Sequence, residues 1–109
     1  MSRSGFLRIS FLVKAKPGTD YEAFYKHWLN VHVPNVMNIM NWVGGFRYVV
    51  SHSMEPAEVP YAGLAELYFH DPGGWDRYRE LIKPDGMEEW VDSTGMQVLP
   101  GTTEMIGIP

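Results

Sequence analysis

The chain has 109 residues, a net charge of −4 at pH 7 and no cysteine. Its length suits one domain, and its few scattered Lys and Arg residues argue against nucleic-acid binding, because phosphate contacts supply most of the affinity of nucleic-acid binders. The absence of cysteine excludes disulfides, thiolate nucleophiles and cysteine-ligated metal sites.

The first predicted element is a β-strand over residues 7–14. Apolar residues alternate there with period two, which is typical of a strand with one buried face. Pro17-Gly18 then predicts a turn. The predicted buried face consists of Leu7, Ile9, Phe11 and Val13.

A helix is predicted from about Asp20 to His32. Thr19 and Glu22 fit a capping box at its start, and Pro34 predicts a break near Val33, because a proline disfavours helical backbone at the residue before it. At about 100° per residue, His32 falls inside the apolar arc of this helix and His27 falls at its margin. The predicted apolar stripe is Tyr21, Phe24, Trp28 and Val31.

The remainder of the chain predicts three more strands and further helical segments. A short helical stretch over 36–42 should end at Gly44-Gly45, and a helix should begin at Asp71-Pro72, where a capping residue precedes a proline. Pro84 should end that helix, and Asp85 with Glu88 could cap another short one. The predicted strands are 46–53, with Phe46, Tyr48, Val50 and His52 on one face, then 61–69, and then 102–108.

This order of elements predicts an α+β fold, ferredoxin-like βαββαβ, as a single domain over residues 1–109. Its four-stranded antiparallel sheet would have helices on one face only. A half-apolar bare face needs a partner. We therefore expect a homodimer in which two sheets pack face to face as a dimeric α+β barrel, with a pocket in each half.

The stretch Phe24-x-x-x-Trp28-x-x-x-His32-x-Pro34 resembles the signature of the EthD-like family of dimeric α+β barrel proteins. Residues 12–14 with Pro17-Gly18 resemble the opening of that family. Three later segments are similar to the cofactor-independent methylmuconolactone methylisomerases: 45–48, 59–61 and 66–69.

The resemblance implies a pocket between the sheet and the first helix, a functional histidine at His32 and a functional tyrosine at Tyr48. Relatives include isomerases and polyketide-tailoring lyases or dehydratases, so the resemblance leaves the reaction open. His32 could act as a general acid or base, or it could merely bond the last carbonyls of its helix. Tyr48 could donate to a developing oxyanion, or it could be a core aromatic.

Glu66 lies in the middle of an apolar strand. If Leu67 and Phe69 point at the helices, Glu66 and Tyr68 point into the barrel, where a partly desolvated carboxylate suits proton transfer. The alternative is a buried ion pair with Arg8 or Arg47. The expected substrate contacts are Trp28, His52, Glu66 and Tyr68.

No metal and no cofactor are expected. His27 and His32 are five residues apart, whereas two metal ligands on one face of a helix are normally three or four residues apart. No apolar stretch approaches the roughly 20 residues of a membrane span. Arg8 and Ser10 interrupt the apolar run near the N-terminus, which argues against a signal peptide there. A cytoplasmic protein without a membrane partner is therefore expected.

The sequence thus predicts a cofactor-independent enzyme that acts by proton transfer on a small aromatic, lactone or polyketide-like metabolite. Isomerisation, dehydration and decarboxylation all fit. One alternative is a non-catalytic binding or accessory protein for a hydrophobic metabolite. Another is an oxygenase of the same barrel class.

Overall fold

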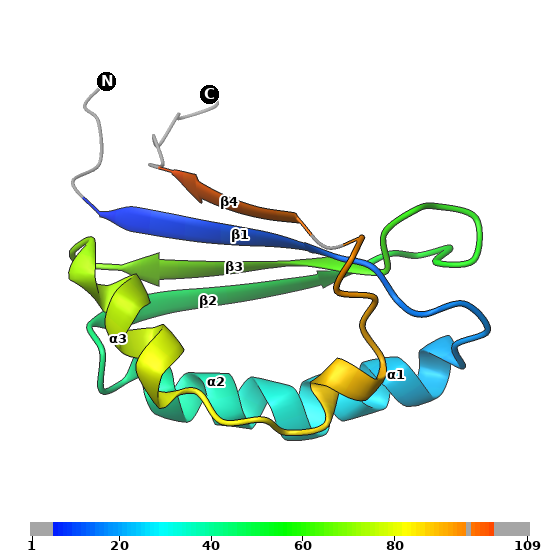
Figure 1. The fold of residues 1–109 in the computed structure, drawn as a ribbon, viewed down its shortest axis with the longest axis horizontal. Helices are drawn as coiled ribbons and strands as arrows, with labels where there is room; N and C mark the ends of the chain where they lie inside the picture. Colours follow the sequence, from blue (N-terminus) through cyan, green and yellow to red (C-terminus); the bar gives the residue numbers. More distant parts are fainter. Residues whose placement is uncertain (1–5, 96, 102–109) are drawn as a thin grey trace, which may run out of the picture.

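The computed structural model describes residues 6–95 and 97–101 of the chain. One long helical stretch and a shorter helix lie against a four-stranded sheet (Figure 1). In chain order the elements are β1 (Leu7–Val13), α1 (Tyr21–His27), the π-helical segment η1 (Trp28–His32), α2 (Val33–Met40), β2 (Gly45–His52), β3 (Gly63–Phe69), α3 (Gly73–Leu81), the 3₁₀ turn η2 (Met87–Glu89) and β4 (Gln97–Gly101).

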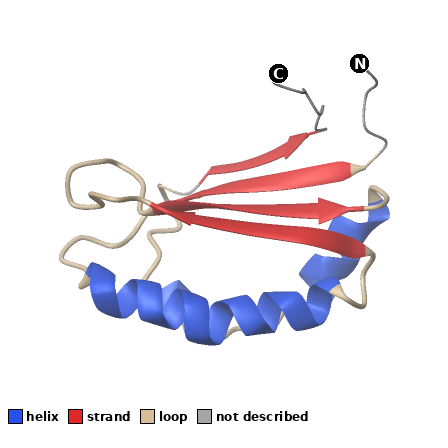
Figure 2. Cartoon of the chain, turned by 180° about the vertical axis from the view of Figure 1, so that it is seen from behind, coloured by secondary structure: helices blue, strands red, loops and turns tan. Residues whose placement is uncertain are grey.

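The sheet has the strand order β2-β3-β1-β4, and every neighbouring pair is antiparallel. Figure 2 shows the described helices on one side of the sheet and no helix on the other. The predicted ferredoxin-like βαββαβ fold is confirmed.

The predicted helix break at Val33 is wrong. α1, η1 and α2 follow one another without a gap, and Pro34 lies in the first turn of α2. A proline is tolerated in a first turn, where its missing N–H is not required. Because the π-helical segment η1 ends at His32, α2 begins a new α-helical first turn at Val33 within the continuous helical stretch. π-Helical segments are frequent at functional sites.

The π-helical segment also changes which residues face the sheet. In a regular α-helix four residues overshoot one turn by about 40°, so Met40 would point about 160° away from Phe24. Both residues are nevertheless buried on the sheet side, because the wider turn corrects the drift. Val31, which was expected on the apolar stripe, is 44% exposed. The buried residues of the long helix are spaced by four or a multiple of four: Phe24, Trp28, Val36 and Met40.

The predicted capping box is also wrong. Asp20 is the N-cap of α1, and its carboxylate accepts a hydrogen bond from the backbone N–H of Ala23 at 3.3 Å. The hydroxyl of Thr19 instead donates to the carbonyl of Lys16 at 2.6 Å. Either side chain can satisfy an orphan N–H of the first turn, so the helix begins where expected with a different cap.

Two details of the strands differ from expectation. The pairing of β2 with β3 shifts between Gly45 and Arg47, and a bulge of this kind turns a side chain to the other face. Phe46 is therefore 43% exposed and stacks on His70 at 4.5 Å between ring centroids. The last strand is β4, and the predicted strand at 102–108 lies outside the described residues.

The buried core lies between the helices and the inner face of the sheet and has two clusters. One is Ile9, Val36, Met40, Val43, Leu67, Phe69 and Tyr78. The other is Val13, Phe24, Trp28, Ala62, Ala65 and Met87. Tyr48 and Phe11 pack against both clusters, so the middle of β1 and β2 lies where the two clusters meet.

Candidate functional site

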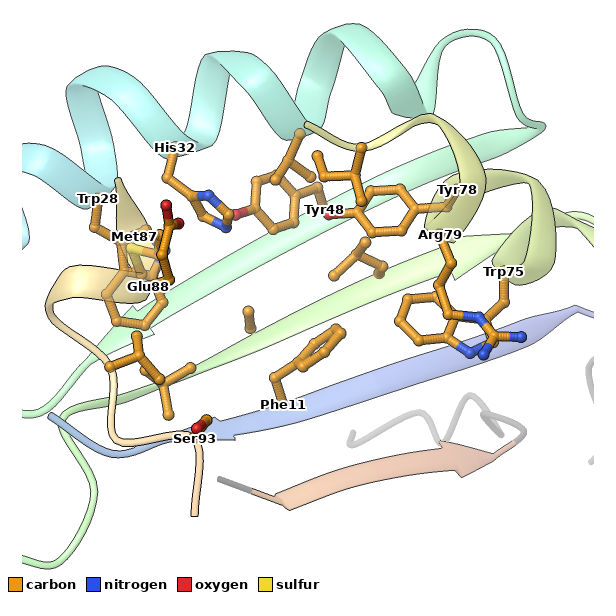
Figure 3. Close-up of a pocket in the computed structure, with 16 residues that line it drawn as sticks. Phe11, Trp28, His32, Tyr48, Trp75, Tyr78, Arg79, Met87, Glu88 and Ser93 are labelled. Carbon is orange, nitrogen blue, oxygen red and sulfur yellow. The ribbon is translucent and has the colours of Figure 1, made fainter. Parts of the chain in front are cut away.

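A cavity of about 430 Å³ lies between the helices and the inner face of the sheet (Figure 3). This volume is in the range of pockets for small organic molecules. Its walls are mostly apolar and aromatic: Phe11, Val13, Trp28, Val36, Ala65, Leu67, Trp75, Ile82, Met87 and Val91. Its remaining lining residues are His32, Tyr48, Tyr78, Arg79, Glu88 and Ser93.

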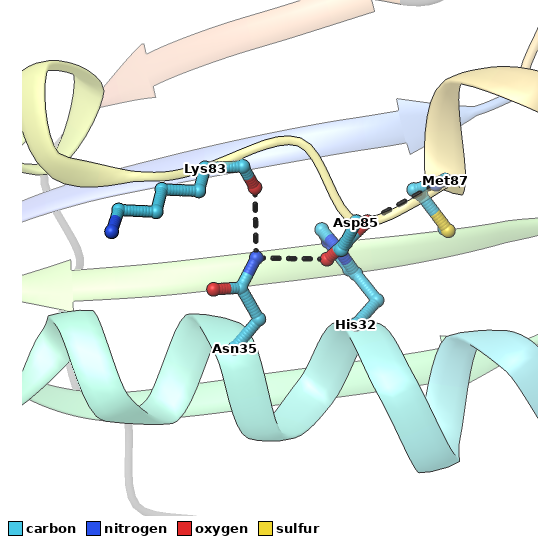
Figure 4. Close-up of polar contacts among 5 residues, drawn as sticks. All are labelled: His32, Asn35, Lys83, Asp85 and Met87. Atoms are coloured by element: carbon cyan, nitrogen blue, oxygen red, sulfur yellow. Dashed lines mark hydrogen bonds and ion pairs between the residues drawn. The ribbon is translucent and has the colours of Figure 1, made fainter.

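His32 lies at the end of η1 and points into this cavity. Its Nδ1 lies 2.6 Å from Oδ2 of Asp85, and the two side chains are 23% and 11% exposed (Figure 4). In Figure 3 the imidazole of His32 and the phenol of Tyr48 point toward one another. Since Asp85 contacts Nδ1, the other ring nitrogen, Nε2, is the one left for a ligand.

The carboxylate of Asp85 is held in its ionised form. Burial works to raise its pKa, but hydrogen bonds from Asn35, His32 and the backbone N–H of Met87 outweigh burial, and the pKa lies below its ordinary value. Asn35 donates at 2.9 Å and Met87 at 3.1 Å. An ionised Asp85 can only accept, so His32 donates its Nδ1–H to it. In the neutral form of the imidazole the lone pair is then on Nε2.

The loop that carries Asp85 is fixed on both sides. Asn35, one turn after His32, also donates to the carbonyl of Lys83 at 3.0 Å. Gly86 follows in the left-handed region with φ of 90°, which an L side chain rarely adopts. A Cβ at Gly86 would lie 3.1 Å from Cε1 of His27, so this glycine allows the loop to approach the long helix closely.

Tyr48 lines the cavity from the middle of β2. Burial raises the pKa of its phenol to about 12, against a smaller lowering effect of the nearby Trp28 indole N–H. Tyr48 is therefore a neutral donor at every physiological pH. Its hydroxyl is buried and makes no hydrogen bond within the described residues. An unsatisfied buried hydroxyl lowers the stability of a protein by roughly 1–3 kcal/mol unless a ligand or a water molecule forms the hydrogen bond.

Trp28 lines the same cavity and is held by rings on its other sides. It stacks on Phe24 at 5.5 Å and lies 4.7 Å from the ring of His52, which is itself stacked on Tyr25 at 4.0 Å. His52 thus supports Trp28 from outside the cavity and does not line it. Burial lowers the pKa of His52, which favours its neutral form.

Glu66 and Tyr68 lie on the opposite face of the sheet. Leu67 and Phe69 point at the helices and are 2% and 0% exposed, as the strand alternation predicts. The hydroxyl of Tyr68 donates to Glu66 at 3.3 Å. In the part of the chain that the structure describes, no ion pair joins Glu66 to an arginine. Of the predicted site residues, the structure brings His32, Tyr48 and Trp28 together and separates Glu66 and Tyr68 from them.

Neither a metal site nor a membrane-spanning helix is found in residues 6–95 and 97–101. No group of three or more His, Asp or Glu side chains there could hold a metal ion. No helix in these ranges combines the length and the apolar character needed to cross a bilayer.

Comparison with protein families gives one assignment. Residues 16–94 match the family described as the EthD domain, which spans most of the chain. This chain belongs to the EthD family. The family resemblance predicted from the helix motif is confirmed, whereas similarity to the methylisomerases is not shown. No curated protein matches the chain.

Solved structures show the same fold as this EthD-family protein. SnoaB from Streptomyces nogalater, a cofactor-independent oxygenase solved as a mutant, matches with a TM-score of 0.67 at 8% identity, over 94% of this chain and 97% of SnoaB. An EthD-family protein from Bacillus halodurans matches with 0.66 at 18% identity, over 92% and 99% of the two chains. A dimeric ferredoxin-like protein from an uncultured marine organism matches with 0.66 at 16% identity, over 97% and 93%.

The EthD domain also contains a site residue that the sequence did not predict. The sequence predicts Asp85 only as the cap of a short helix; the N-cap of η2 is Gly86, and Asp85 instead accepts a hydrogen bond from the backbone N–H of Met87. Its second oxygen reaches His32 across 53 positions of the sequence. The motif Pro84-Asp85-Gly86 indicates a turn, but nothing in its spacing indicates a partner on the long helix.

Proposed function

We propose that this EthD-family protein is a cofactor-independent enzyme that moves a proton next to a carbonyl or phenol group of a small aromatic, lactone or polyketide-like molecule. The observation that supports this most is the His32–Asp85 pair at an apolar cavity. A carboxylate that fixes the tautomer of an imidazole makes the other ring nitrogen a general base.

In the proposed reaction Nε2 of His32 takes a proton from a carbon next to a carbonyl. The electron pair of the broken C–H bond forms a carbon–carbon double bond, and the carbonyl oxygen becomes an enolate oxygen. Asp85 stabilises the imidazolium that forms. Tyr48, a neutral donor, hydrogen-bonds the oxygen where negative charge develops.

The fate of this anion decides the reaction class. Return of the proton to another carbon gives an isomerisation, and loss of a leaving group from the neighbouring carbon gives an elimination. A second candidate is oxygenation, in which the anion gives its electrons to dioxygen. The fold similarity to a protein described as a cofactor-independent oxygenase favours this candidate, and the same base could serve it.

We also propose that the protein is a homodimer. The sheet face that carries none of the described helices presents Leu12 and Leu99, which are 36% and 60% exposed, and exposed apolar faces of this kind mark association sites. A protein of the same fold is described as dimeric. In a face-to-face pair Glu66 and Tyr68 would lie between the sheets, so we assign them to this interface and not to the His32 cavity.

The enzyme proposal is tested by proton exchange, because exchange needs the base but not the complete reaction. The protein is incubated in D₂O with an aryl ketone, a lactone and anthrone, and loss of the α-hydrogen signal is followed by NMR. We expect at least one class to exchange faster than in buffer, and dioxygen uptake with that probe would favour the oxygenase. Probes that bind in the cavity without accelerated exchange would contradict the proposal and favour the non-catalytic binding protein.

A further inference from the structure

Two hydrogen-bond donors at the cavity have no partner among the residues that the structure describes. Nε1 of Trp28 and the hydroxyl of Tyr48 are both buried, and neither makes a hydrogen bond within the described ranges. Buried polar groups are nearly always satisfied in native proteins, so each exception requires an explanation. Both residues line the cavity that His32 enters.

The two donors come from facing elements and lie close together. Trp28 begins η1 on the long helix, and Tyr48 lies in β2 and packs against the cluster that contains Trp28. The indole N–H is near enough to the phenol to lower its pKa, although the two groups do not reach hydrogen-bond geometry. The two residues therefore bring two hydrogen-bond donors to one part of the cavity wall, and neither donor has an acceptor among the described residues.

Neighbouring side chains hold the Trp28 donor rigidly. Phe24 and His52 pack against its ring. On β3, Gly63 lets the ring approach the sheet, since a Cβ there would lie 2.9 Å from Cη2 of Trp28. Fixed donors stabilise a developing charge without reorganisation at the moment of reaction. A rigid, desolvated N–H is therefore better suited to hydrogen-bond an anion than to hydrogen-bond an exchanging water molecule.

We propose that Trp28 Nε1–H and Tyr48 O–H together form an oxyanion site that binds the phenolate or enolate oxygen of the ligand. This inference rests on the proposed function and extends it by naming the ligand class: phenols and enolisable aryl ketones. The aromatic walls hold the ring of the ligand, and the two donors hold its oxygen. His32 then takes the proton, from the hydroxyl of a phenol or from the α-carbon of a ketone.

The test uses 4-nitrophenol, whose phenolate is seen by its own absorbance. The purified protein is titrated with it across the pKa of the free compound, with 4-nitrotoluene as a ligand of similar shape without the oxygen. We expect the bound phenol to ionise at lower pH than the free one. Trp28→Phe and Tyr48→Phe should each weaken phenolate binding about 10–100-fold and change nitrotoluene binding little.

A matched substitution controls for general effects of losing an indole. Trp90 stacks on Phe24 at 5.8 Å and does not line the cavity, so Trp90→Phe should leave phenolate binding unchanged. If Trp28→Phe loosens the core, as its melting temperature would show, benzothienylalanine at position 28 removes only the N–H. Unchanged phenolate affinity in both the position-28 and the Tyr48→Phe variants would overturn the inference and mean that water satisfies the donors.

A His32 variant can separate phenolate binding at the oxyanion site from proton exchange by the base. In a His32→Ala variant the two donors remain, so we expect the preference for phenolate over nitrotoluene to persist while exchange of carbon-bound hydrogen is lost. Loss of that preference on His32→Ala alone would assign phenolate binding to the imidazole and overturn the role of Trp28. Failure of the exchange assay with phenolate binding intact would contradict the proposed function and leave this site standing.

Discussion

Nδ1 of His32 and Oδ2 of Asp85 lie 2.6 Å apart, although 53 positions separate the two residues in the sequence. The contact joins the long helix to the loop after α3 and orients the imidazole into the cavity (Figures 3 and 4). In the proposed reaction Asp85 is a positioning residue, because it acts on the ligand only through His32. Its contribution can be separated from that of the imidazole.

The first prediction concerns the charge of Asp85. Asp85→Asn should lower the exchange rate about 10²–10⁴-fold, because an amide can donate to Nδ1 and stabilise the wrong tautomer. The rate is measured by NMR in D₂O on the folded variant. Asp71→Asn is the matched control, since Asp71 pairs with Arg77 on the surface outside the cavity. Equal losses in both variants would mean that the effect is not specific to the His32 partner.

The second prediction is the pH dependence of stability that Asp85 confers. Its pKa is lowered by folding, so its stabilising contribution is present above the unfolded value of about 3.9 and is lost as the pH falls through the folded value. Melting temperatures of the parent and Asp85→Asn should therefore differ most near neutrality and converge at low pH. A constant difference down to the lowest measurable pH would show that the charge of Asp85 is not responsible.

The third prediction tests the loop that carries Asp85. Gly86→Ala places a side chain at positive φ, which costs roughly 1–2 kcal/mol, or about 4–16 °C in melting temperature for a domain of this size. Because the new Cβ would press on His27, the loop should shift and the exchange rate should fall. Gly18→Ala has a similar φ of 77° and nothing within 4 Å of its Cβ, so it should lose stability and keep its rate. A Gly86→Ala protein with the parental rate would show that Asp85 tolerates this displacement.

The fourth prediction concerns the sheet face that carries none of the described helices. Leu99→Lys should convert the proposed dimer to a monomer near 12.5 kDa by light scattering at micromolar concentration, because a buried lysine without a partner opposes association. Leu29→Lys is the control, since Leu29 is 51% exposed and belongs to the helical stretch on the other side of the sheet. A parent protein that is already monomeric would rule out the dimer.

Local patterns in the sequence predicted the sheet well. The alternation from Leu7 to Val13 indicated both the strand and its buried face, because one side chain in two must face the core. The helix was harder to predict. Pro34 indicates a break only if the preceding turn is a regular α-helix, and the π-helical segment that accommodates it has no clear sequence signal.

Only part of the site could be predicted from the sequence. His32, Trp28 and Tyr48 each lie on a face that periodicity or a motif could identify. Asp85 could not be paired with His32, because contacts between distant segments depend on the packing of α3 and its loop. Glu66 was correctly placed on the face opposite Leu67, but only the three-dimensional arrangement shows that the cavity lies on the other side of the sheet.

The role of His32 as the base is tested by the exchange rate of a His32→Ala variant with and without added imidazole. We predict a folded protein with a rate about 10²–10⁴-fold lower, partly restored by free imidazole. A His27→Ala variant should stay close to the parent, because His27 lies beside the Gly86 loop and does not line the cavity. A folded His32→Ala protein that exchanges the probe at the parental rate would show that His32 is not the base.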